Sequence, residues 1–264
     1  MKRSRESLLT LAALLSAAPV LADESVSSKN PDILGIQLGM SYEEVAALAR
    51  KRHSGGMHVL GEWKSDGTPS VPVRFFYKSS RAGGGLQRGS EILHVAFAGA
   101  PSPSAAIEVM REESFEQGKE PEYEMVFAGL VEKYGSPSFV DRTKQTHMWF
   151  LDGNAPDDAA QREDLVERCK PADSAGGRSP NSYVDDIDRS RSMMYASKCG
   201  RTLYVSMRLR ATAMFQPGGN LLAQSMEIVL TDHDAGIQAH KLTRQMVEEA
   251  KKRYREENVQ KPDL

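Results

Sequence analysis

The sequence predicts an α+β fold in which helices pack on an antiparallel sheet. Two observations support this class. Segments whose apolar residues have helical spacing and that carry capping signals are followed by segments in which apolar and polar residues alternate, as in strands. In chain order they read as one helix and three strands, the same four elements again, and a final helix, with the two halves starting about 80 residues apart. Antiparallel strands joined by short connections are naturally covered by helices, so we expect tandem α-β-β-β units followed by a C-terminal helix.

Residues 1–22 have the three parts of a secretory signal peptide. Three basic side chains in residues 1–5 precede an uncharged run at residues 8–21, and small residues lead up to Ala22 and Asp23, between which we expect cleavage. The alternative is a membrane anchor, but a 14-residue helix is only about 21 Å long, and the hydrocarbon core is roughly 30 Å thick. We therefore expect a protein without a membrane span after cleavage, located in the periplasm or secreted.

The two cysteines, Cys169 and Cys199, both follow the predicted leader. In an exported chain an even cysteine count favours a disulfide, and neither residue has a second cysteine or a histidine at zinc-ligand spacing. Two buried free thiols are the alternative, which an oxidising compartment disfavours. We predict a Cys169–Cys199 bridge that closes a loop of about 30 residues and stabilises the protein by roughly 3–4 kcal/mol.

The first unit is expected at residues 33–118, after a flexible lead-in at residues 23–32. Ser41 and Glu44 have the spacing of a capping box, which predicts a helix that runs to about Arg52. Three strands should follow. The third has helix propensity as well as alternation, but two prolines before it favour a strand. The predicted strands are residues 71–78, 91–98 and 105–115.

The second unit is expected at residues 119–264. Gly135 and Pro137 end its predicted helix at residues 122–134. Residues 152–191 have little apolar periodicity, so we expect a disulfide-tethered insertion with one possible helical turn at residues 160–168. The remaining predicted elements are strands at residues 145–151, 201–210 and 221–231, and an amphipathic helix at residues 236–258.

Two segments carry a resemblance to a known superfamily. Residues 35–45 (GIQLGMSYEEV) and 130–137 (LVEKYGSP) are similar to the helix-opening and helix-ending motifs of the SmpA/BamE-like and β-lactamase-inhibitor-protein-like (BLIP-like) superfamily of bacterial envelope proteins. The resemblance covers about half of the predicted mature chain. It implies a helix on an antiparallel sheet, repeated in tandem, that serves as a binding module. It transfers no catalytic residue, and the chain lacks the lipidated cysteine of the lipoprotein members.

The chain contains no nucleophile elbow, dinucleotide fingerprint or Walker A motif, so we expect no catalytic residue and no cofactor. Asp232, His233 and Asp234 form the most ligand-like group in the sequence. A hydrolase or small-ligand site at this corner is the alternative function. We prefer a structural interpretation in which a strand ends there and Asp234 caps the next helix, and we therefore predict no metal site.

Composition limits the remaining functions. The formal net charge of −2 predicts no nucleic-acid partner. Met193, Met194 and Tyr195 form an apolar group before Cys199 that is a possible partner contact, although we prefer to interpret it as the entry into the next strand. We expect a soluble periplasmic protein-binding module, an envelope accessory or inhibitor-like protein, whose partner is another envelope or periplasmic protein.

Overall fold

The computed structural model describes residues 30–53, 56–63, 71–81, 88–141, 145–171, 196–211 and 221–258. The predicted leader and its cleavage site, Ala22 and Asp23, lie outside the described residues, as do Met193, Met194 and Tyr195. The elements are β1 (Asp32–Ile33), β2 (Ile36–Gln37), α1 (Tyr42–Arg52), β3 (Gly56–Trp63), β4 (Val71–Arg81), β5 (Glu91–Phe97), β6 (Ala106–Ser114), α2 (Tyr123–Tyr134), β7 (Phe139–Asp141), β8 (Thr146–Phe150), α3 (Ala159–Cys169), β9 (Arg201–Ala211), β10 (Leu221–Asp232) and α4 (His233–Asn258).

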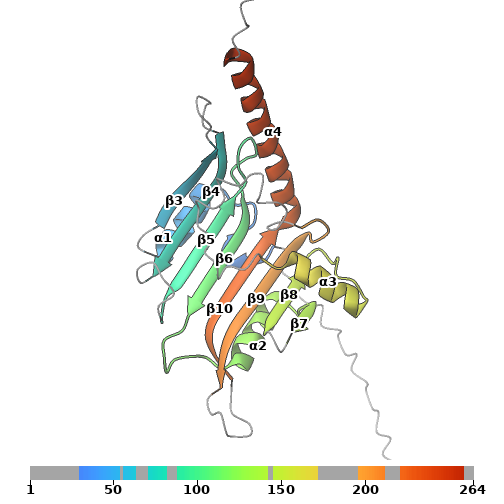
Figure 1. The fold of residues 1–264 in the computed structure, drawn as a ribbon. Helices are drawn as coiled ribbons and strands as arrows, with labels where there is room; N and C mark the ends of the chain where they lie inside the picture. The colour runs from blue at the N-terminus through green and yellow to red at the C-terminus, as the bar shows by residue number, and fades with distance from the viewer. Residues whose placement is uncertain are drawn as a thin grey trace, which may run out of the picture.

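Eight strands form one antiparallel sheet in the order β3-β4-β5-β6-β10-β9-β8-β7 (Figure 1). The fourth strand of each half lies at the centre, where β6 and β10 pair, for example through Val109 and Leu230. We call this central pairing the seam. The α+β class, the antiparallel sheet and the C-terminal helix are thus confirmed, and the two halves form one continuous sheet.

The structure adds a strand to each half. In the first half, β3 contains Gly56 and Gly61, which interrupt the apolar alternation that marks a strand in sequence. In the second half, β7 has three residues, too few to show a period. Each unit is therefore one helix followed by four strands in the sheet, with α3 inserted between β8 and β9 in the second unit.

Local signals explain the ends of the first two main helices. At α1, Ser41 Oγ accepts from the Glu44 amide at 3.3 Å, and Glu44 Oε2 accepts from the Ser41 amide at 2.8 Å, so the predicted capping box is present. At the end of α2, Gly135 has a φ of 79°, a conformation that favours glycine.

The start of the last helix differs from the prediction. The helix α4 begins at His233, and Asp232 Oδ1 accepts from the Ala235 amide at 2.8 Å. The carboxylate that caps α4 is therefore that of Asp232, and the predicted cap at Asp234 is wrong. Asp234 instead lies in the first turn, where its negative charge suits the helix dipole.

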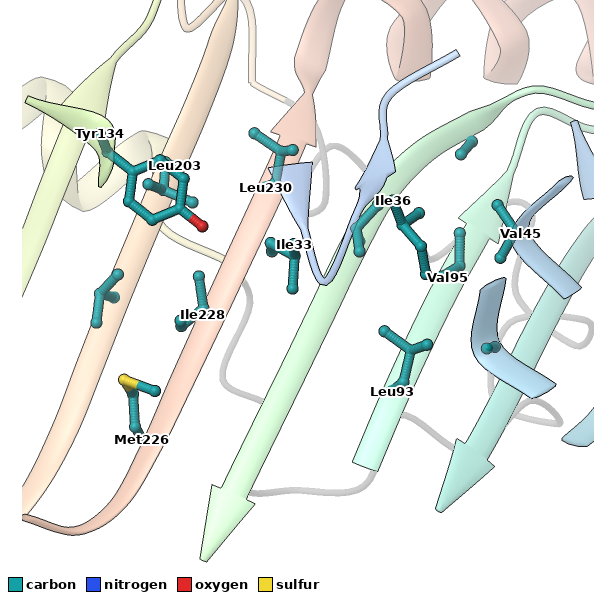
Figure 2. Packing of buried hydrophobic residues seen from close by; sticks show 14 of the residues in the cluster. Ile33, Ile36, Val45, Leu93, Val95, Tyr134, Leu203, Met226, Ile228 and Leu230 are labelled. Atoms are coloured by element: carbon teal, nitrogen blue, oxygen red, sulfur yellow. The ribbon is translucent and has the colours of Figure 1, made fainter. Parts of the chain in front are cut away.

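A short hairpin, β1–β2, precedes α1 and was not expected from the sequence. Its two-residue turn, Leu34-Gly35, has positive φ at both positions, as a tight hairpin requires. The hairpin lies over the seam, and its side chains Ile33 and Ile36 are almost fully buried against the sheet (Figure 2). Between them, the hairpin, α1 and α2 cover one face of the sheet.

Candidate functional site

The two faces of the sheet are covered to different extents. Side chains such as Val95, Val205 and Leu230 point to the face where α1, α2 and the β1–β2 hairpin lie, and all three are fully buried. We call this the covered face. The alternate residues point to the other face, where α3 packs on Met148 and Phe150 at one side, and α4 packs on Ala96. Figure 1 shows α3 in front of the sheet and α2 behind it. We call this second side the open face.

A band of side chains on the open face keeps contact with solvent. Glu112, Glu227, Ser206 and Thr146 occupy one row in register across β6, β10, β9 and β8, and each is half-buried. Tyr204 is half-buried and Arg208 is exposed, both on β9 and directed to the same face. We call these six residues the open strip: Glu112, Glu227, Ser206, Thr146, Tyr204 and Arg208.

The open strip combines hydroxyl groups, an aromatic ring and charges of both signs. Glu112 and Glu227 lie directly opposite each other across the seam. Burial raises the pKa of Tyr204, and interactions with the Thr146 and Ser206 hydroxyls offset part of that rise. Tyr204 is therefore neutral at pH 7. Such a surface is suited to recognising another molecule through hydrogen bonds and ion pairs.

The predicted disulfide forms one border of the open face. Cys169 at the end of α3 is bonded to Cys199, with the two Cα atoms 5.7 Å apart. Both cysteines are buried together with Leu165 and Val166 of α3. The residues 159–169 form a full helix where the sequence predicted one possible turn, because Asp158 Oδ1 accepts from the Gln161 amide and starts it. The bridge thus ties α3 to the beginning of β9.

The Asp232, His233 and Asp234 corner has a structural arrangement. His233 is 2% exposed; its Nδ1 accepts from the Ala196 amide at 3.2 Å, and its Nε2 lies 3.1 Å from Thr202 Oγ1. Burial lowers the pKa of His233 to about 4, against a smaller opposing effect of the Cys169 backbone. The ring is thus neutral and engaged at both nitrogens, so His233 joins the segment before Cys199 to the sheet. It offers no free nitrogen to a substrate.

Two further buried groups lie on the covered face, and sequence reasoning did not find them. Glu91 is fully buried, with Oε2 accepting from Arg52 Nε at 2.8 Å and Oε1 accepting from Arg111 Nε at 2.6 Å. Burial alone would raise the pKa of Glu91, but the two arginines outweigh that effect and hold it at about 2. His147 lies beneath α2, where Phe127 packs on its ring and burial lowers its pKa to about 4. Both groups fasten helices to the sheet.

Neither a metal centre nor a membrane-crossing element is present in the described ranges. Within these ranges, His, Cys, Asp and Glu side chains form no group of three that could hold a metal ion. No helix in the same ranges is both long enough and apolar enough to cross a bilayer.

Comparison of the chain with protein-family models, with curated proteins and with solved structures found no match. The fold and the site define an α+β protein with one eight-stranded antiparallel sheet, of which one face is covered by helices and the other is partly open.

Proposed function

We propose that this protein is an exported, non-catalytic module that binds another protein of the cell envelope through the open strip. The observation that carries the proposal is the difference between the two faces of the sheet. The covered face is packed against α1, α2 and the hairpin, whereas the open face keeps six neighbouring polar and aromatic side chains in contact with solvent. A rigid sheet that presents such a row can bind a partner without rearranging.

The residue types of the open strip support a protein partner. Tyr204 offers a large contact area with little loss of side-chain freedom, and tyrosine and arginine are both enriched at protein interfaces. The hydroxyl and charged side chains of the same strip can form hydrogen bonds with polar groups of a partner. The open strip thus favours a mixed polar and aromatic interface.

Export is supported by the Cys169–Cys199 bridge, since disulfides persist in oxidising compartments such as the periplasm or the cell exterior. The predicted signal peptide at residues 1–22 points to the same location. The motifs at residues 35–45 and 130–137 add the resemblance to binding modules of the bacterial envelope.

Site-specific photocrosslinking in intact cells tests the proposal. A benzophenone amino acid replaces Ser206 in the open strip. In the control it replaces Ala128, an exposed residue of α2, the helix that packs on the covered face. The position at Ser206 is expected to give one discrete crosslinked protein that the Ala128 position does not give. Equal products at both positions, or none at Ser206 across growth conditions, would refute the proposal.

A further inference from the structure

The two edges of the sheet differ in length and in what lies beside them. At one edge, β7 has three residues and ends at Asp141, and its Phe139 packs in the cluster that contains α3. At the other edge, β3 has eight residues and pairs with β4 alone among the described strands; Figure 1 shows it at the left of the sheet. An edge strand presents a row of backbone N–H and C=O groups that no neighbouring strand receives. The longer edge, β3, is therefore the one that can accept a further strand.

The sequence of β3 lacks the features that block pairing at an edge. Proteins protect exposed edges by keeping the strand short, by placing lysine or proline on it, or by bending it with a bulge. β3 contains no lysine, arginine or proline, and Glu62 is its one acidic residue. The bulge in its pairing with β4 lies between Gly61 and Glu62, close to the end of the strand. Residues 56–61 therefore form a regular stretch of edge without a protecting residue.

This stretch is complementary to itself. Two antiparallel strands are related by a two-fold axis, so a strand can pair with the same strand of a second copy. When the axis passes through Val59, this residue lies opposite its own counterpart, and β-branched pairs of this kind stabilise a sheet. In the same register Glu62 lies opposite Gly56, so the two carboxylates are not paired with each other. The charges of β3 thus permit a symmetric pair.

We propose that β3 is a dimerisation edge, at which two copies of this chain join antiparallel with Val59 on the two-fold axis. The backbone hydrogen bonds between the two β3 strands then continue both sheets into one. An axis perpendicular to a sheet preserves its faces, so the open strips of the two copies face the same side. These strips lie on β6, β10, β9 and β8 and stay free in the dimer. The dimer itself does not depend on the proposed protein-binding function.

Analytical ultracentrifugation of the purified protein over a range of concentrations tests the dimer. The wild type should form a dimer that dissociates on dilution. Val59→Lys brings two positive charges together at the axis and should weaken the dimer roughly tenfold or more. The control Val140→Lys changes a 38% exposed position on the short edge β7 and should leave dimerisation as it is. A wild type that stays monomeric up to about 1 mM would overturn the proposal, and so would undiminished dimerisation of a folded Val59→Lys protein.

Val59→Cys tests the register with a smaller change of side chain. Opposite Cα atoms of an antiparallel pair lie about 4.5–5.5 Å apart, which is within the reach of a disulfide. The two native cysteines are bonded to each other, so the new thiol has only its counterpart in the second copy to react with. Mild oxidation should give a covalent dimer on a non-reducing gel for Val59→Cys and little for Val140→Cys. Equal yields at the two positions, or no covalent dimer for Val59→Cys, would overturn the proposal.

Discussion

Replacing Glu91 by Gln should cost the protein a large share of its stability without changing the shape of the side chain. Glu91 is fully buried at the start of β5 and accepts hydrogen bonds from Arg52 at the end of α1 and from Arg111 on β6. Its Oε2 also lies 3.3 Å from His53 Nε2. The carboxylate thus joins α1 to two strands. A neutral glutamine amide in its place would leave Arg52 without this buried counter-charge and Arg111 with its ion pair to Glu113 alone.

The size of this loss follows from the pKa of Glu91. The arginines lower this pKa from its ordinary value of 4.5 to about 2. At roughly 1.4 kcal/mol per tenfold change in proton affinity, the charged carboxylate stabilises the fold by about 3 kcal/mol. Because the folded-state pKa lies below the unfolded-state value, this contribution is complete above about pH 5 and decreases as the pH falls towards 2. At pH 3 roughly half of this contribution should remain.

Urea unfolding of the wild type and of Glu91→Gln, followed by tryptophan fluorescence at pH 7 and at pH 3, measures this difference. Trp149 is a buried reporter whose Nε1 donates to the Gly135 carbonyl. The control is Glu248→Gln, which removes an exposed ion pair with Lys251 on α4 and should change stability by less than about 0.5 kcal/mol. A loss below about 1 kcal/mol at pH 7, or an equal loss at both pH values, would refute the reasoning.

Three further changes test other parts of the fold. His147→Phe should keep the free energy of unfolding at pH 7 within about 1 kcal/mol, because it removes the bond to the Tyr123 hydroxyl and also a buried Nδ1 that has no partner within the described residues. The wild type should lose stability between pH 6.5 and 4, because its His147 binds a proton in the unfolded state but, with a pKa of about 4, stays neutral in the folded state. The Phe variant should lose less stability over this range, which urea midpoints at pH 7 and 4.5 measure. Replacing both Cys169 and Cys199 by Ser should lower stability by roughly 3–4 kcal/mol, and a melting temperature equal to that of the wild type would contradict the role of the bridge. Ser41→Ala should cost about 1 kcal/mol and Ser41→Thr much less in urea unfolding, since threonine keeps the capping hydroxyl.

Short-range signals explain how much of the fold could be predicted. Some elements are defined by signals that act within a few residues: the capping hydroxyl of Ser41, the glycine at position 135 and the alternation of β5. These elements are where the sequence predicts them. The pairing of β6 with β10 joins residues far apart in the chain, and no local pattern distinguishes one continuous sheet from two. The edge strands β3 and β7 were missed because glycines interrupt one and three residues make up the other.

The candidate site was likewise predictable only where the signals are local in the sequence. The cysteine pair was predictable because the chain has only two cysteines, so a disulfide within it could form in one way alone. The open strip was not, because Ser206 and Glu227 become neighbours only through strand register. The buried state of His233 depends on Ala196 and Thr202, which reach it from other segments, so the sequence alone left a hydrolase corner open as an alternative.

The most direct test of the account is the affinity of the crosslinked partner for two arginine variants, measured by isothermal titration calorimetry. Ser206→Arg places a bulky charge in the middle of the open strip, and Ala128→Arg places the same charge on the exposed side of α2. We expect at least a tenfold loss of affinity for Ser206→Arg, about 1.4 kcal/mol, and no change for Ala128→Arg. Unchanged affinity of a folded Ser206→Arg protein, with a loss for Ala128→Arg, would contradict it.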